Sequence, residues 1–390
     1  MTISFPGRSR PPRYQVSLDD PPETRWNGVV TDYLDHLPAA LEMVDDLIGT
    51  GWLSEFVLSG FGALTRLGLV HFGGEIKGIA QAAGVPIGKV ALLQVAYEAF
   101  AACTSIVVEG QAHPLHIRTM DWDMPALQAL TIEVDFVSQG KTLFSATTWA
   151  GYVGVLTGVR AGAFSVSINY RRTEQVGRDG QALRATARNF LRGLFGRHWP
   201  VSFLVREVLQ QDETFALALA SLTASDLMAP TYITVAGVAP GEGAIITRER
   251  EGGTHRNLVL ELHSSSEPFI VQANMDVERD EAFSAVDAWQ DICESHHRRQ
   301  LARTALGAVE RMTETDLWLL TSVPPILADD TVYTVLMVPA TGSLKTRVHA
   351  TPGQENAGKE RFRAERKKAN AWVAQQRKIT GHKRNASTRQ

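Results

Sequence analysis

Hydrophobic and polar positions follow two different periods along this chain and divide it into blocks. Over residues 26–69 apolar residues recur at helical spacing, and residues 52–72 are apolar nearly all round, which favours a buried helix over a lipid-docking surface. After Cys103 the pattern changes to short runs rich in β-branched and aromatic residues, which is typical of strands. We predict strands over 104–108, 115–118, 130–136, 143–148, 154–156, 164–169, 232–235, 244–247, 258–262, 269–272, 332–337 and 344–348, and helices over 182–222, 298–312 and 314–320.

The order of these blocks predicts the class of fold. Helical patterns are missing between the successive strands over 104–169, so these strands should pair antiparallel, and the alternating blocks of strands and helices argue for a layered α+β domain. Residues 1–13 contain three prolines and should form a mobile arm. Residues 14–102 should form a helical segment, residues 103–350 the catalytic body and residues 351–390 a separate tail.

Charge is distributed unevenly along the chain. The whole chain has 39 Lys+Arg and 42 Asp+Glu, but residues 351–390 hold 11 Lys+Arg and 3 Asp+Glu. The tail therefore carries +8 and the rest of the chain −11. Such an end is usually solvated, and the alternative is a weak contact with an anionic surface. Its two aromatic residues, Phe362 and Trp372, do not make a stacking platform, so we expect no specific nucleic-acid partner.

Two cysteines, Cys103 and Cys293, are too few for a disulfide scaffold. They lie far apart and outside any C-x2-C pair, which excludes a zinc cluster built on thiolates. A chain of 390 residues, 44% of them hydrophobic, can bury a core without either. The sequence shows no signal-peptide apolar region and no apolar run near 18 residues, so we expect a cytoplasmic location.

Common catalytic motifs do not explain this sequence. It has no P-loop, no G-x-G-x-x-G after a strand, no G-x-S-x-G elbow and no H-E-x-x-H. His113 and His116 flank a proline and enter a strand, and the adjacent His296 and His297 would point in different directions on a helix. We therefore expect no metal and no cofactor.

Cys103 and the residues at the end of the next strand remain as candidates for chemistry. A lone cysteine at the start of a strand is most often a small buried hydrophobe. Here, however, Arg118 and Asp121 follow within one hairpin. A thiolate needs a nearby positive charge, and an amine that serves as a base needs an acceptor to orient it. These three residues therefore form a candidate site.

The chain resembles the acid ceramidase and N-acylethanolamine acid amidase family, relatives of the bile salt hydrolases among the N-terminal nucleophile hydrolases. The resemblance spans about residues 14–348. It rests on many short pieces in the same order, namely 14–26, 75–88, 103–107, 118–121, 151–158, 162–165 with Asn169, 271–276, Arg298-Arg299 and 332–335.

The resemblance implies a four-layer αββα sandwich and a precursor that cleaves its own chain. The scissile bond would join Ala102 to Cys103, and the two fragments, residues 1–102 and 103–390, would remain associated. Cleavage frees the α-amino group of Cys103, whose ordinary pKa of about 7.7–8.0 suits a general base. One residue would then supply both nucleophile and base.

Four further catalytic residues follow from the resemblance. Arg118 would stabilise the thiolate and contact substrate, and Asp121 would hold the new amine. Asn274 would donate a hydrogen bond to the tetrahedral oxyanion, a contribution that can be worth roughly 10²–10³ in rate. Arg298 would complete the polar ring.

The reaction implied by the resemblance is hydrolysis of the amide bond of an N-acylated small molecule or lipid with an apolar acyl group. Phe56 and Phe61, in the apolar segment 52–72, are predicted to line or cover the site. Trp122 and Tyr170 are predicted to contact the substrate as well. Cys293 lies outside the matching pieces and is interpreted as structural.

Two positions depart from the family pattern. Tyr170 stands where the family has an acidic residue, and His296-His297 stand where two acidic residues are usual. We expect the missing carboxylates to leave nearby arginines less compensated. The substrate head group, the rate of self-cleavage or the pH optimum would change as a result, since histidines gain charge near a pH of about 6.5.

Two other functions fit the same sequence. An acyltransferase of the isopenicillin N acyltransferase type would pass the acyl group to an amine, which adding amines to the trapped acyl-enzyme would reveal. A catalytically silent relative would act as a binding protein through its basic tail, and removing residues 351–390 would then abolish binding to anionic surfaces.

Overall fold

Strands and helices follow one another in blocks in the structure, a computed structural model that describes residues 8–48, 52–95, 102–171, 198–253, 257–262, 267–276, 294–307 and 311–349. The strands are β1 (Arg8–Ser9), β2 (Arg13–Ser17), β3 (Ala102–Glu109), β4 (Pro114–Asp121), β5 (Thr131–Ser138), β6 (Lys141–Trp149), β7 (Thr157–Arg160), β8 (Phe164–Tyr170), β9 (Thr231–Ala236), β10 (Gly243–Arg248), β11 (Leu258–Glu261), β12 (Phe269–Gln272), β13 (Thr331–Val338) and β14 (Ser343–His349). The helices are α1 (Asn27–Asp32), α2 (Leu37–Ile48), α3 (Trp52–Arg66), α4 (Gly73–Ala83), α5 (Ile87–Leu93), α6 (Ala126–Leu130), α8 (Val201–Gln211), α9 (Phe215–Ala224), α11 (Ser295–Gly307) and α12 (Glu314–Leu320).

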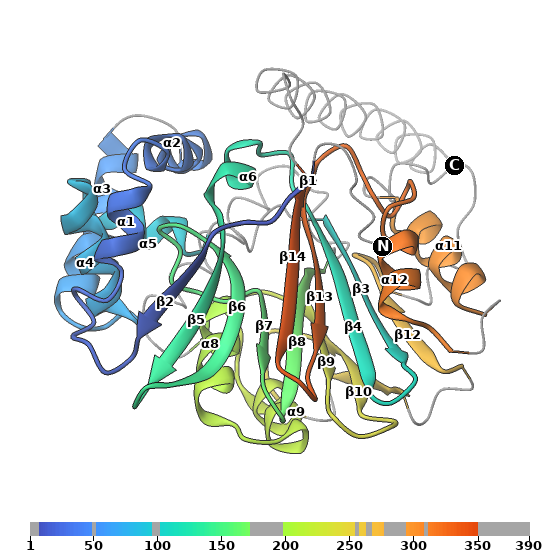
Figure 1. The fold of residues 1–390 in the computed structure, drawn as a ribbon. Coiled ribbons are helices and arrows are strands. Elements are labelled where there is room, and N and C mark those ends of the chain that lie inside the picture. The colour runs from blue at the N-terminus through green and yellow to red at the C-terminus, as the bar shows by residue number, and fades with distance from the viewer. Residues whose placement is uncertain are drawn as a thin grey trace, which may run out of the picture.

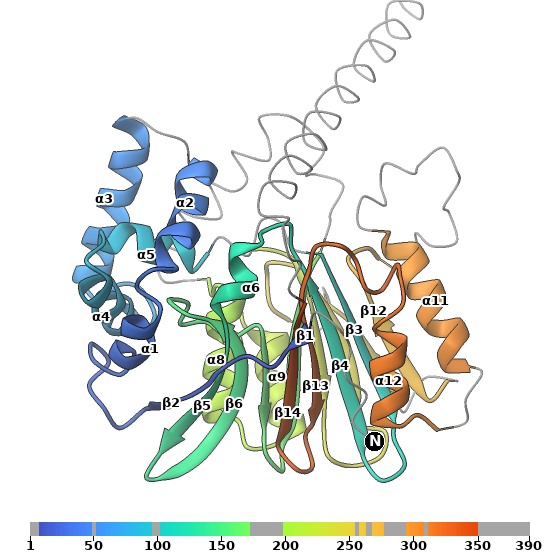
Figure 2. The same ribbon diagram turned by 45° about the horizontal axis from the view of Figure 1, so that its top comes forward.

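Two sheets form the centre of the molecule. The strand order is β1-β14-β13-β4-β3-β12 in the six-stranded sheet and β11-β10-β9-β8-β7-β6-β5-β2 in the eight-stranded sheet. The sheets face each other, α11 and α12 cover the outside of the first, and α8 and α9 cover the outside of the second (Figures 1 and 2). The predicted α+β class is confirmed, with two sheets between two layers of helices.

The alternation of side chains along β3 decides what faces the gap between the sheets. Val107 packs against Ala236 and Ile245 of the eight-stranded sheet, whereas Ile106 packs in a separate cluster with residues of α11 and α12. Successive side chains of a strand point to opposite faces. Cys103 therefore lies on the same face as Val107 and points toward the eight-stranded sheet.

The start of the chain is tied into both sheets. β1 pairs with β14, and β2 runs parallel to β5 while the other paired strands are antiparallel. Arg13 forms ion pairs with Glu133 at 2.9 Å and with Asp135 at 3.0 Å. The predicted mobile arm is therefore wrong for residues 8–13, because strand pairing and ion pairs hold them.

Helices α1 to α5 form a lobe beside the edge made by β2 and β5 (Figure 1). Within it α3 buries only one face, since Phe61 is 5% exposed and Phe56 is 72% exposed. The prediction of a helix buried all round is therefore wrong for α3. Its buried side packs on α5 at backbone distance: a Cβ at Gly88 would lie 2.0 Å from the Leu58 carbonyl oxygen.

A buried carboxylate joins this lobe to the rest of the molecule. Glu75 on α4 receives two hydrogen bonds of 2.6 Å from Arg206 on α8 and one of 2.9 Å from Arg25. The Arg206 guanidinium also lies over the ring of Phe72, 4.2 Å from its centre. Removing one partner of such a buried ion pair usually costs about 3–5 kcal/mol, so this contact fixes the lobe against α8.

One predicted strand is absent from the structure. The strand predicted over 154–156 is an irregular buried loop, and β7 begins at Thr157. The helices predicted over 182–222 are confirmed for α8 and α9, and Thr214 caps the second of them by accepting from the Leu217 N–H. Cys293, residues 182–197 and the tail 351–390 lie outside the described residues.

No helix among the described residues is long and apolar enough to cross a membrane. The cytoplasmic location stays a prediction.

Candidate active site

The sulfur atom of Cys103 lies in a buried, positively charged environment. Cys103 and Arg118 are both 0% exposed, and Arg118 Nη2 lies 3.2 Å from Cys103 Sγ. The same guanidinium donates to the Ile168 carbonyl at 2.8 Å and to the Tyr333 hydroxyl at 3.1 Å. These contacts place its positive charge where it would stabilise a thiolate.

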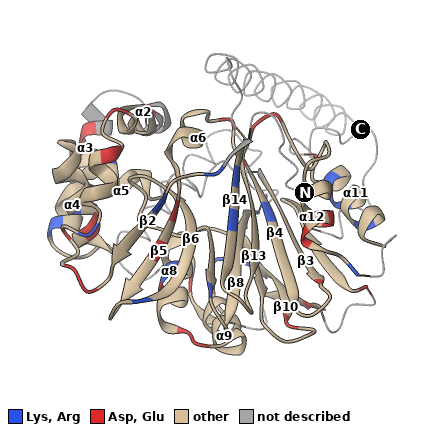
Figure 3. Ribbon diagram, in the orientation of Figure 1, with Lys and Arg blue, Asp and Glu red and all other residues tan. Residues whose placement is uncertain are grey.

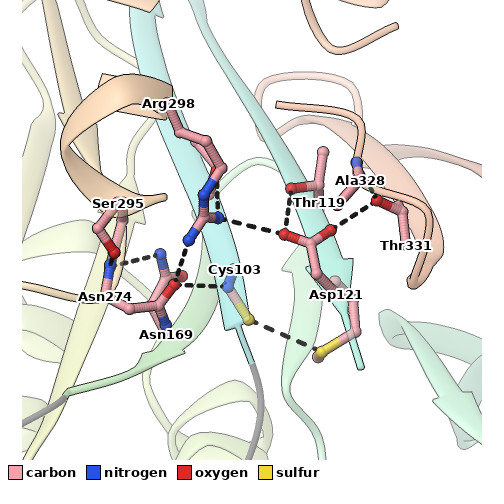
Figure 4. A network of polar contacts seen from close by, with 12 residues as sticks. Cys103, Thr119, Asp121, Asn169, Asn274, Ser295, Arg298, Ala328 and Thr331 are labelled. Carbon is pink, nitrogen blue, oxygen red and sulfur yellow. Dashed lines mark hydrogen bonds and ion pairs between the residues drawn. The ribbon is translucent and has the colours of Figure 1, made fainter. Parts of the chain in front are cut away.

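The backbone nitrogen of Cys103 faces a different set of groups. Its N–H donates to Asn274 Oδ1 at 2.8 Å, and Arg298 Nη2 donates to the same oxygen at 2.8 Å (Figure 4). Asn274 Nδ2 donates to the Tyr170 carbonyl at 2.8 Å, which fixes the orientation of the amide group. In this structure, therefore, Asn274 contacts Cys103 through its oxygen, and its role as an oxyanion donor stays a prediction.

Asp121 belongs to the same cluster through Arg298. Arg298 Nη1 donates to Asp121 Oδ2 at 3.2 Å and to the Thr104 hydroxyl at 2.8 Å, while the Thr331 hydroxyl donates to Asp121 Oδ1 at 2.8 Å (Figure 4). Burial raises the pKa of Asp121 to about 7, and nearby Asp330 raises it too, against the lowering effects of Arg298 and Thr331. The carboxyl group would thus change its charge near neutral pH.

The structure brings all five predicted catalytic residues together. Cys103 and Arg118 meet on the inner face of the six-stranded sheet, and Arg298 links Asp121 to Asn274 beside the Cys103 nitrogen. Basic residues mark β4 and α11, the elements that carry Arg118 and Arg298 (Figure 3). Their catalytic roles remain to be tested.

Residues near the two departures from the family pattern do have acidic or carbonyl partners. Arg171, directly after Tyr170, forms ion pairs with Asp276 at 2.8 Å and Glu249 at 2.6 Å. Arg299 donates to the Met275 carbonyl. The expectation of less compensated arginines is therefore wrong for Arg171, and for Arg299 it stays a prediction.

The predicted substrate-binding residues are not all in one place. Trp122 lies in an apolar pocket, and Tyr170 touches Asn274 through its carbonyl group. Phe61 is buried inside the helical lobe and Phe56 is exposed on it, and neither lines this pocket. The lining consists of Ala40, Leu93, Trp122, Leu127, Leu130, Trp149, Ala150 and Tyr152.

Three residues of the site were not singled out by sequence reasoning. Tyr333 positions Arg118, Thr331 holds Asp121, and Thr104 holds Arg298. Thr104 and Tyr333 lie inside pieces that carry the family resemblance, so that resemblance was the available signal. Thr331 follows a loop and offered no such signal.

Comparisons with known proteins find relatives along most of this chain. The family model described as the beta subunit of N-acylethanolamine-hydrolyzing acid amidase matches residues 9–67. N-acylethanolamine-hydrolyzing acid amidase of Caenorhabditis elegans is 32% identical over 352 residues, which cover 86% of this chain and 92% of that protein. Acid ceramidase of Mus musculus is 30% identical over 366 residues, which cover 87% of each chain.

A solved structure shows the same relationship. The Caenorhabditis elegans N-acylethanolamine-hydrolyzing acid amidase ortholog aligns with a TM-score of 0.51 and 31% identity, covering 61% of this chain and 93% of that one. The fold and the site thus define a member of a family of amide hydrolases. The chain belongs to the acid ceramidase and N-acylethanolamine acid amidase family, and the resemblance found in the sequence is confirmed.

The raised pKa of Asp121 makes a prediction for the dependence of stability on pH. The folded state keeps a proton that the unfolded state loses near its ordinary value of 3.8, so the contribution of Asp121 to stability falls between about pH 4 and pH 7. Asp121→Asn cannot titrate. We expect the wild-type-minus-variant difference in the free energy of unfolding to fall by a few kcal/mol over this interval in urea titrations.

Asp316→Asn is the matched control. Hydrogen bonds from Thr313 lower the pKa of Asp316, so its contribution is present above about pH 4 and is lost as the pH falls further. The wild-type-minus-variant difference in the free energy of unfolding for Asp316→Asn should stay constant between about pH 5 and pH 7. If this difference were also independent of pH for Asp121→Asn, the environment assigned to Asp121 would be contradicted.

Proposed function

We propose that this protein is an N-terminal nucleophile hydrolase that cleaves its own chain between Ala102 and Cys103 and then hydrolyses the amide bond of an N-acylated substrate. The observation that carries the proposal is that the sulfur and the nitrogen of Cys103 contact different polar residues. Arg118 contacts its sulfur at 3.2 Å, and Asn274 accepts from its nitrogen at 2.8 Å. Any buried N–H needs an acceptor, but a structural cysteine needs no guanidinium group at its sulfur.

Self-cleavage would proceed through an acyl shift from nitrogen to sulfur. The Cys103 thiolate attacks the carbonyl carbon of Ala102, a C–S bond forms, the C–N bond breaks and the nitrogen takes up a proton. Water then hydrolyses the thioester, which leaves a carboxylate on Ala102 and a free amine and thiol on Cys103. The register that pairs Ala102 with Asp121 brings this bond beside the polar cluster.

Substrate hydrolysis would use the same groups a second time. The free amine of Cys103 takes the thiol proton, and the thiolate attacks the substrate amide to form an acyl-thioester. The amine returns the proton to the leaving nitrogen, and water completes the cycle. Arg118 stabilises the thiolate, while Asn274 and Arg298 orient the amine together with Asp121.

The apolar lining of the pocket supports an apolar acyl group as the part of the substrate that binds here, and the pocket has to widen to admit it, because it now has room for about one water molecule. Trp122 follows Asp121 directly in the chain, and the Trp149 ring lies 6.1 Å from that of Tyr333, the partner of Arg118. The pocket is thus linked to the nucleophile through Tyr333 and Arg118. Relatives named for hydrolysing N-acylethanolamines and ceramides favour a fatty acyl chain here.

Two contacts would hold the fragments together after cleavage. β2 pairs with β5, and the buried pair between Glu75 and Arg206 joins α4 to α8. In both cases one partner precedes Cys103 and the other follows it. The family model named for a subunit also matches residues 9–67, entirely before Cys103.

Intact-mass measurement of the purified full chain tests the proposal. The wild type should yield two fragments that divide after Ala102, and Cys103→Ala should remain one chain of 390 residues. Met120→Leu is the matched control, because Met120 touches Cys103 Sγ at 3.7 Å but carries no charge, and this variant should still cleave. A wild type that stays intact from about pH 4 to pH 8 would refute the mechanism.

Filling the apolar pocket should change the preference for acyl length. Ala150→Trp places a large side chain in the pocket lining, and we expect kcat/KM for long-chain N-acyl amides to fall about 10-fold or more while short-chain substrates are spared. Phe56→Ala changes the exposed residue of the helical lobe and should leave both unchanged. The opposite pattern would favour a lid formed by segment 52–72.

A further inference from the structure

A chain of buried polar side chains crosses the space between the two sheets behind the candidate site. His116 Nδ1 lies 2.9 Å from Ser165 Oγ and its Nε2 lies 2.8 Å from Ser167 Oγ. Ser167 Oγ lies 2.8 Å from Ser105 Oγ, which donates to Asn169 Oδ1 at 2.6 Å. All five side chains are 0% exposed. None of them takes part in the reaction steps proposed above.

The direction of the hydrogen bonds can be derived from the end of the chain at Asn169. Asn169 Nδ2 lies 3.0 Å from the Gln272 carbonyl and 3.2 Å from the Ala273 carbonyl. Carbonyl oxygens only accept, so both Nδ2 hydrogens are donated and Asn169 Oδ1 must be the acceptor toward Ser105. The single hydroxyl proton of Ser105 is therefore given to Asn169.

The donor and acceptor roles of the other members of the hydrogen-bond chain follow by the same reasoning. Because Ser105 has no second proton, Ser167 must donate to it, and Ser167 must then accept from His116 Nε2. Burial, and to a smaller degree the charge of Arg118, lowers the pKa of His116 to about 3, so the ring is neutral and carries its single proton on Nε2. Its Nδ1 accepts from Ser165.

The hydrogen-bond chain ends at the segment that carries Asn274. Gln272 and Ala273, whose carbonyl groups Asn169 holds, immediately precede Asn274, and Asn274 Oδ1 accepts from the Cys103 nitrogen at 2.8 Å. Figure 4 shows Asn169 directly beside Asn274. A shift of this short segment would move the acceptor away from the nitrogen.

We propose that Asn169 is a positioning residue for the reaction of Cys103, and that Ser105, Ser167 and His116 hold it in a one-way hydrogen-bond chain. The inference rests on the proposed function. An apolar filling would be the simpler way to pack two sheets, since a buried polar network is stable only when every member is satisfied. Here each member is satisfied in one arrangement, which gives Asn169 a single orientation.

A double-mutant cycle on the full chain tests the proposal. Asn169→Ala should lower kcat for amide hydrolysis about 100-fold and leave KM within about twofold, because the acyl pocket lies elsewhere. Added to Asn274→Ala it should cause no further loss, because it acts through Asn274. If the double variant lost the product of the two single-variant factors in kcat, or if Asn169→Ala raised KM with kcat unchanged, the positioning role would be overturned.

Two further variants separate positioning from general destabilisation. Ser105→Ala removes one donor to Asn169 and should lower kcat about 10-fold. Thr234 on β9 is paired in register with Ser167 on β8, and its buried hydroxyl makes no hydrogen bond within the described part of the chain. Thr234→Val removes this hydroxyl. It should leave kcat unchanged. Equal losses in kcat for the two variants would contradict the proposal.

Nitrogen NMR of ¹⁵N-histidine-labelled Cys103→Ala protein tests the direction of the hydrogen-bond chain without an activity assay. The His116 signal, identified by its loss in His116→Gln, should show a neutral ring protonated on Nε2 at about pH 5. A ring protonated on Nδ1, or a charged ring, would overturn the derived direction. A wild type that never cleaves an amide would instead refute the proposed function and the positioning role of Asn169, whatever the tautomer of His116.

Discussion

The guanidinium group of Arg298 is the interaction on which the rest of the site depends. It is buried and donates to Thr104, Asp121 and Asn274, three residues from three different strands or loops. A buried cation must be paired, so this arrangement is stable only if α11 brings Arg298 to the end of β3 and β4 where Asp121 lies. The layer of helices outside the six-stranded sheet thus supplies the donor that holds Asp121 and Asn274 beside the Cys103 nitrogen.

The side chain and the backbone nitrogen of Cys103 point in different directions and meet different groups. Its side chain points into the space between the sheets, toward Arg118, while its nitrogen meets the cluster around Arg298. The side chain of a strand residue points to one face of the sheet, whereas its N–H points toward the neighbouring strand, here to Asn274 just after β12. Self-cleavage would turn that nitrogen from a backbone donor into a free amine without moving its surroundings.

Much of this could be predicted from the sequence, for physical reasons that differ between residues. Cys103, Arg118 and Asp121 lie on one hairpin, so their proximity follows from local pairing. Asn274 and Arg298 come from distant segments, and only the family resemblance linked them to the site. Thr331 could not be found in this way, because its contact with Asp121 depends on how β13 joins β4.

The fold was predictable to a similar degree. Alternating apolar residues indicated most strands correctly, but an apolar loop before β7 imitated a strand, and no local pattern could show that β1 finds its partner in β14. The exposed face of α3 was hidden by its composition, since Phe56 and Phe61 look alike in sequence and differ only in what they pack against.

The most direct test of the account is a crystal structure of the processed wild-type protein. The account predicts that the chain ends at Ala102, that the free α-amino nitrogen of Cys103 lies within hydrogen-bond distance of Asn274 Oδ1, and that its sulfur remains beside Arg118. An amine turned away from Asn274 and Asp121, or an intact bond before Cys103, would contradict it.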